Sequence, residues 1–104
     1  MSRLIFFKMP NCKACDKFEQ NVWPSLITDP NFAEYSFVRY LFGDINGVKY
    51  RLHDHYNFVC EVPYFAIETS DGEIINLGSM RKDRTVNGLK THCQNALQYK
   101  NSLQ

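Results

Sequence analysis

Apolar residues along the chain gather into short segments that predict four β-strands. Residues 4–7 (Leu-Ile-Phe-Phe) form a continuous apolar run, which is typical of a strand buried on both faces of a sheet. Residues 35–42 are rich in aromatic and β-branched side chains and predict a second strand. Residues 64–68 and 73–77 predict two more, and Ser70-Asp71-Gly72 predicts a hairpin turn that pairs them antiparallel.

Apolar residues at intervals of three and four positions predict a helix after the first strand. This stripe begins after Lys13 and contains Ala14, Cys15, Phe18, Val22 and Leu26. Pro24 interrupts the stripe. Because proline lacks a backbone N–H and its ring clashes with the preceding turn, the helix should kink or stop near Trp23.

The remaining segments predict two further helices. Thr28-Asp29-Pro30-Asn31 predicts a turn, and residues 43–47 (Gly-Asp-Ile-Asn-Gly) predict a break after the second strand. A weaker apolar stripe predicts a second helix over residues 48–57, and a clear one predicts the last helix over 82–99. The repeated order of strand, helix and strand implies parallel pairing through right-handed crossovers.

The composition indicates one globular domain. The 104 residues are enough for a single core but too few for two domains of ordinary size. The net charge of +1 provides no strong field for attracting nucleic acid or an anionic membrane. Only four consecutive apolar residues precede Lys8, too few for a signal peptide or a membrane span. We therefore expect a single domain over residues 1–104, in the cytoplasm, with neither nucleic acid nor membrane as a partner.

Two of the four cysteines form a Cys-x-x-Cys pair where the first strand pattern gives way to the first helix. Asn11 is predicted to cap this helix, so Cys12 falls at or next to its first residue. The unpaired N–H groups of the first turn favour negative charge, and Lys13 adds a positive charge, so Cys12 is the predicted nucleophilic thiolate. Cys15, about one turn further on, lies on the same side of the helix and is the predicted resolving thiol.

Other interpretations of the cysteines stay open. A Cys-x-x-Cys pair also begins many zinc sites. Cys60 and Cys93 stand alone among core-forming residues and are interpreted as packing residues. Cys60 lies close before Pro63, so a second redox thiol is the alternative for this residue.

The histidines and a short charged run carry less specific signals. His53 and His55 are two positions apart on a predicted helix and do not share a face, so a metal site built from them and His92 is not expected. Residues 82–84 (Lys-Asp-Arg) begin the last predicted helix and are interpreted as solvated. A contact with glutathione or a partner protein is the alternative for these three residues.

The order of parts resembles the thioredoxin superfamily over nearly the whole chain. The parts are a strand, Cys-x-x-Cys at a helix start, a strand, a helix, Val62-Pro63 before a hairpin, Gly78 and a last helix. This resemblance implies an α/β thioredoxin-like fold with a central mixed sheet of four strands and helices on both faces. It also implies that the Val62-Pro63 bond is cis and faces the two cysteines, because the cis form costs little before proline.

The resemblance further implies a surface for binding substrates beside the cysteines. Its expected residues are Pro10, Val62, Pro63 and Gly78. In such a surface the backbone of Val62 pairs with an extended substrate segment as an added strand, which gives affinity without demanding a particular sequence.

Two features depart from typical thioredoxins. Pro10 stands two places before Cys12, as in many glutaredoxins. The buried acid that assists the resolving cysteine in thioredoxins has no counterpart in the first strand, residues 4–7. Lys8 and water are therefore the bases predicted for Cys15.

The sequence thus predicts a small thiol–disulfide oxidoreductase that acts on disulfide-containing proteins and is expected to be a monomer. A thioredoxin reductase or a glutathione system would supply electrons. No metal and no cofactor are expected beyond the redox-active Cys12–Cys15 pair, with glutathione as the alternative co-substrate. The alternatives are a glutathione-dependent glutaredoxin and a non-catalytic binding module, because a fold does not determine a function.

Overall fold

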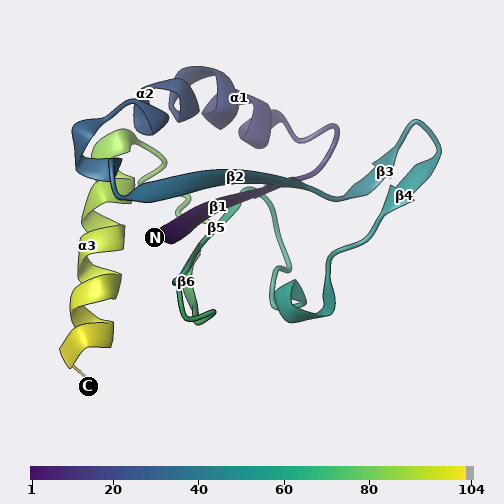
Figure 1. Ribbon diagram of the computed structural model, residues 1–104. Coiled ribbons are helices and arrows are strands. Elements are labelled where there is room, and N and C mark those ends of the chain that lie inside the picture. The colour runs from purple at the N-terminus through teal and green to yellow at the C-terminus, as the bar shows by residue number, and fades with distance from the viewer. Residues whose placement is uncertain (103–104) are drawn as a thin grey trace.

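The computed structural model describes residues 1–102 and contains a central sheet of four strands in the order β2-β1-β5-β6 (Figure 1). The strands are β1 (Ser2–Lys8), β2 (Tyr35–Leu41), β5 (Tyr64–Glu68) and β6 (Ile74–Gly78). β1 pairs parallel with β2 and antiparallel with β5, and β5 pairs antiparallel with β6. The predicted mixed sheet is confirmed, with strand ends within two residues of the prediction.

The prediction of repeated parallel pairing holds for β1 and β2 and is wrong for β5. The helices α1 (Lys13–Asn21) and α2 (Trp23–Ile27) return the chain from the end of β1 to the start of β2 (Figure 1). Residues 42–63 contain no α-helix that could make a second return. The chain therefore re-enters the sheet where β1 finishes, with Phe7 opposite Tyr64, and β5 runs back antiparallel.

One face of the sheet is covered by all three α-helices. Leu4 and Phe6 of β1 point to this face and belong to the larger core cluster. The helices contribute Phe18 and Trp23, together with Leu89 and Cys93 of α3 (Val86–Ser102), to the same cluster. The side chains of these helices therefore bury the first half of the core.

The other face of the sheet is covered without an α-helix. Ile5 and Phe7, the alternate residues of β1, pack there against Tyr56 of the 3₁₀ helix η2 (Asp54–Tyr56). Helical segments thus lie on both faces as predicted, but the second face is closed by one 3₁₀ turn and its flanking loops. Side chains that alternate along a single strand divide the core into these two layers.

The predicted interruption of the first helix near Trp23 is confirmed. Val22 ends α1 and caps α2, and Pro24 is the second residue of α2, where a backbone N–H has no helical partner to lose. The turn predicted at residues 28–31 contains the start of the 3₁₀ helix η1 (Pro30–Phe32), which Asp29 caps.

Residues 43–57 differ from the predicted break followed by a helix. The strands β3 (Gly43–Ile45) and β4 (Val48–Tyr50) form a hairpin that projects from the sheet (Figure 1). Asn46 and Gly47 form its turn with φ of 52° and 82°, the left-handed conformations that an Asn-Gly hairpin turn requires. All residues of β4 are exposed, and the two apolar residues of the predicted stripe that pack against the core, Leu52 and Tyr56, follow the hairpin.

The last helix, α3, begins four residues later than predicted. The Oγ1 of Thr85 accepts the backbone N–H of Gly88 at 2.9 Å and caps the first turn. The preceding loop lies against this turn, because a Cβ on Gly88 would collide with the backbone carbonyl of Asp83. Residues 82–84 are therefore in a loop. Neither α3 nor any shorter helix within residues 1–102 has the length and apolarity needed to cross a bilayer.

Candidate active site

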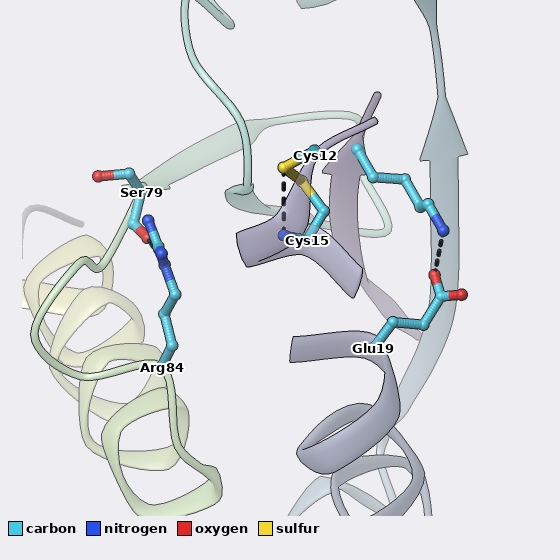
Figure 2. Close-up of a disulfide and its surroundings, with 6 residues drawn as sticks. Cys12, Cys15, Glu19, Ser79 and Arg84 are labelled. Atoms are coloured by element: carbon cyan, nitrogen blue, oxygen red, sulfur yellow. Dashed lines mark hydrogen bonds and ion pairs between the residues drawn. A yellow bond between two sulfur atoms is a disulfide. The ribbon is translucent and has the colours of Figure 1, made fainter. Parts of the chain in front are cut away.

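Cys12 and Cys15 are joined by a disulfide at the start of α1, with their Cα atoms 5.2 Å apart (Figure 2). Cys12 is the N-cap of the helix, and its Sγ accepts a hydrogen bond from the backbone N–H of Cys15 at 3.1 Å. The prediction that Asn11 caps the helix is therefore wrong by one residue. Asn11 instead takes a left-handed conformation, with φ of 60°, and turns the chain towards the helix.

The two cysteines differ in exposure. Cys15 is 0% exposed and belongs to the larger core cluster. Cys12 is half-buried and packs at the edge of that cluster. A partner molecule can therefore contact Cys12 from solvent, whereas Cys15 is reached only through Cys12.

The start of α1 favours a negatively charged sulfur at Cys12. The N–H of Cys15 points at that sulfur, and the aligned peptide dipoles add partial positive charge at this end of the helix. Both contributions come from the backbone at the start of α1. Lys13 is the first residue of α1 and its side chain is exposed. Its effect on the pKa of Cys12 stays a prediction.

Strand register brings two other predicted site segments to the same end of the sheet. Tyr64 lies opposite Phe7, so Pro63 is placed beside the last residue of β1, where the chain enters the cysteine loop. Gly78 lies opposite Phe65 and is therefore near the start of β5. The Val62-Pro63 bond is cis, as predicted. Pro63 is buried, and Val62, like Cys12, packs at the edge of the larger cluster.

Pro10 lies in the loop before the cysteines and is half-buried. Gly43, at the start of β3, has φ of 103°, and a Cβ there would lie 3.0 Å from Cε of Met9 and 3.4 Å from Cδ of Pro10. The absence of a side chain at Gly43 therefore lets the loop pack closely on this strand. The roles of Pro10, Val62, Pro63 and Gly78 in binding a substrate stay predictions.

Comparison with known proteins identifies the fold. Neither a protein-family model nor a curated protein matches the sequence. A solved structure that matches is the periplasmic thioredoxin SoxS from Paracoccus pantotrophus in its reduced form. The TM-score is 0.58, and the sequences are 15% identical, with 89% of this chain and 99% of that chain covered. The chain has a thioredoxin-like fold. The predicted fold class is thereby confirmed, and at this identity the likeness concerns the fold alone.

On this thioredoxin-like fold, an acid that the sequence analysis missed pairs with the last residue of β1. Lys8 forms an ion pair with Glu19 of α1, drawn in Figure 2, and Arg39 pairs with the same carboxylate at 3.3 Å. Lys8 therefore pairs with Glu19, and its predicted role as a base for Cys15 stays a prediction. Glu19 follows Cys15 by four positions, a spacing that places both on one side of a helix and could have indicated it.

The two remaining cysteines occupy different environments. Cys93 is 2% exposed, as predicted for a packing residue, and burial raises the pKa of its thiol to about 12. Cys60 is exposed, so its interpretation as a packing residue is wrong. The loop that precedes Pro63 places Cys60 outside both core clusters, which apolar neighbours in the sequence could not reveal.

Cys60 of the oxidised protein should react with iodoacetamide near neutral pH, whereas Cys93 should not. With a pKa of about 12, about one Cys93 thiol in ten thousand is ionised at about pH 8. Burial also keeps the reagent away from the Cys93 sulfur. Mass spectrometry of the alkylated protein should therefore find one modified cysteine. In urea both should react. Modification of Cys93 at a rate similar to that of Cys60 in the folded protein would contradict this assignment.

The histidines do not gather into a metal site among residues 1–102. The rings of His53 and His55 stack, with centroids 5.6 Å apart and planes 11° from parallel, so the expectation that they lie on different faces is wrong. His53 caps η2 in an extended conformation and His55 lies within η2, so neither is on the α-helix that the prediction assumed. His92 is on α3 and contacts Asp83 at 3.1 Å. No group of three His, Cys, Asp or Glu side chains in the described residues is arranged to hold a metal.

Proposed function

We propose that this protein is a thiol–disulfide oxidoreductase that reduces or exchanges disulfides in protein substrates. The observation that carries this proposal is the asymmetry of the cysteine pair. Cys12 is a partly exposed helix cap whose sulfur accepts a backbone N–H, and Cys15 is a buried sulfur within bonding reach of it. An accessible sulfur that is stabilised as an anion is suited to attack, and an enclosed neighbour is suited to resolve.

The reaction begins with the reduced protein. The Cys12 thiolate attacks one sulfur of a substrate disulfide, which forms a Cys12–substrate disulfide and releases the other substrate sulfur as a thiolate that takes a proton from water. Cys15 then gives its proton to water, and its sulfur attacks that of Cys12, which expels the second substrate sulfur as a thiolate that takes a proton from water in turn. The protein dithiol is oxidised by two electrons to the Cys12–Cys15 disulfide, and the substrate disulfide is reduced to two thiols.

The electron donor is a separate part of this proposal. A thioredoxin reductase or a glutathione system would return the disulfide to the dithiol. Pro10, two places before Cys12, favours the glutathione-dependent alternative, a glutaredoxin. Turnover coupled to glutathione and glutathione reductase, compared with turnover coupled to thioredoxin reductase, separates the two. We also propose a cytoplasmic setting, which the exposed free thiol of Cys60 supports because free thiols persist in reducing compartments.

The proposed function predicts that Cys12 ionises more readily than Cys15. The pKa of Cys12 should lie below that of an ordinary cysteine because the thiol is at a helix start, whereas burial should keep the pKa of Cys15 from falling in the same way. Ultraviolet thiolate absorbance against pH, in Cys15→Ser and Cys12→Ser variants that both carry Cys60→Ser, measures each thiol separately. Cys93 stays protonated over this range because its pKa is about 12. An ordinary pKa at Cys12 would refute the mechanism.

A further inference from the structure

A groove of about 300 Å³ lies between α1 and the loop that precedes α3. Ala14, which lies between the two cysteines in the sequence, is part of its wall. Phe18 and Val22, further along α1, give it an apolar floor. Figure 2 shows Arg84 on the side of the disulfide opposite Glu19, at the loop that forms the other wall. A chain bound at Cys12 can therefore continue into this groove.

The walls of the groove carry four cationic side chains and no acidic one. These cations are Lys17 on α1 and Arg81, Lys82 and Arg84 on the loop. Arg81 pairs with Glu61 at 2.7 Å. The other three form no ion pair with a carboxylate among residues 1–102. The groove therefore has a surplus of positive charge although the chain as a whole is nearly neutral.

The acids on the neighbouring elements are directed elsewhere. Glu19 of α1 pairs with Lys8 and Arg39. Asp83, between two of the cations in the sequence, contacts His92 of α3 at 3.1 Å. Glu61 is the exception, because it pairs with Arg81 and its charge also acts on Arg84. Asp16 on α1 forms no ion pair among residues 1–102 and does not line the groove. The four cations of the walls therefore outnumber the acids that pair with them.

Arg84 is held in place as part of this wall. Its Nε donates a hydrogen bond to the backbone carbonyl of Ser79 at 2.8 Å. Burial lowers the pKa of Arg84, and the nearby charge of Arg81 lowers it further. A guanidinium has five N–H donors, and among residues 1–102 only this one forms a hydrogen bond to the protein. Arg84 thus presents a fixed, partly desolvated cation with free donors.

We propose that the groove binds an acidic segment of the substrate polypeptide, with substrate carboxylates against Arg84, Lys17 and Lys82 and a substrate sulfur against Cys12. This inference rests on the proposed function and names its preferred substrates. The charge of the walls suits carboxylates, and the apolar floor suits the carbon atoms of the same side chains. A polypeptide fits better than a small free anion because the groove extends along α1 from Ala14, which lies between the two cysteines in the sequence, to Val22.

The test compares two disulfide peptides that differ only in the residues that flank the disulfide, two Asp in one and two Asn in the other. The reduced protein is mixed with each peptide, and the second-order rate constant for disulfide reduction is measured at low and at high salt. We expect the acidic peptide to react about tenfold faster at low salt, with the advantage lost at high salt.

Variants then assign this advantage to the groove. Lys17→Gln and Arg84→Gln should each reduce it at least about twofold. Arg84→Lys should keep most of it, because the charge remains although the bond to Ser79 is lost. Lys49→Gln, which removes an equal charge from the exposed strand β4, should leave it unchanged. Lys17 is exposed and makes no side-chain hydrogen bond among residues 1–102, so its variant tests the groove without disturbing the fold.

The outcomes separate this inference from the proposed function. Equal rates for both peptides would overturn the proposal that the groove binds an acidic segment, and would leave the proposed oxidoreductase function intact. The same conclusion would follow if Lys49→Gln removed the advantage of the acidic peptide as strongly as Lys17→Gln does. Reduction of neither peptide would overturn the proposed function and the groove together. An acidic preference lost only in the groove variants supports both.

Discussion

A Cys15→Ser variant should accumulate a covalent mixed disulfide with a protein substrate, whereas a Cys12→Ser variant should accumulate none. Cys12 is the sulfur that solvent reaches, so it forms the first bond with the substrate. Cys15 is 0% exposed and acts only by breaking that bond. Without Cys15 the intermediate has no internal thiol to resolve it, and without Cys12 it does not form. The expected difference is close to all or none.

The measurement is non-reducing electrophoresis after the reduced variants are mixed with insulin. Both variants should carry Cys60→Ser, because Cys60 is an exposed thiol that could form its own mixed disulfide. The matched control is Cys60→Ser alone, which should reduce insulin without a lasting adduct. Equal trapping by the Cys12→Ser and Cys15→Ser proteins would mean that the roles of the two sulfurs are assigned wrongly.

A Phe6→Ala substitution should remove much of the stability of the fold. Phe6 is 0% exposed, and its ring centroid lies 4.9 Å from that of Phe18, 5.5 Å from Trp23 and 5.6 Å from Phe65. Deleting such a ring costs about 3–5 kcal/mol, because burial is lost and a cavity remains. Small domains have only about 5–15 kcal/mol of unfolding free energy in total.

Urea unfolding followed by circular dichroism measures this loss. Tyr99→Ala is the control, since Tyr99 is 69% exposed and its truncation should change the free energy of unfolding by about 0.5 kcal/mol or less. Phe6→Leu should fall between the two. A loss of less than about 1 kcal/mol in Phe6→Ala would show that β1 is not the strand on which the larger core cluster is built.

The parts of the fold that the sequence predicts correctly are those whose signals are local. The apolar run of β1 and the Ser70-Asp71-Gly72 turn each determine a structure within a few residues. The hairpin of β3 and β4 was missed although Asn46-Gly47 is a strong local signal. Val48 and Leu52 are spaced as on a helix, and spacing alone does not reveal that Val48 is exposed on β4 while Leu52 packs against the smaller core cluster from the loop that follows.

The candidate site divides in the same way. The Cys12–Cys15 pair can be predicted from the spacing of the cysteines, and the spacing of Glu19 from Cys15 could have indicated Glu19, which pairs with Lys8. The groove beside α1 cannot be predicted in this way, because it brings together Lys17 and Arg84 from segments far apart in the chain. Which elements meet at the end of β1 depends on strand register and on the late start of α3, and no local pattern encodes either.

Because β5 runs antiparallel to β1, the disulfide and the turn after β5 lie at opposite ends of the sheet. The disulfide lies at the end where β1 finishes and β5 begins, whereas the exposed Ser70-Asp71-Gly72 turn lies at the opposite end, beyond Glu68. Seven residues of β1, at about 3.3 Å each, separate these ends by about 20 Å. A surface anchor or fluorophore inserted in that turn would therefore leave the dithiol facing freely into solution, so single immobilised molecules could be followed through repeated exchange.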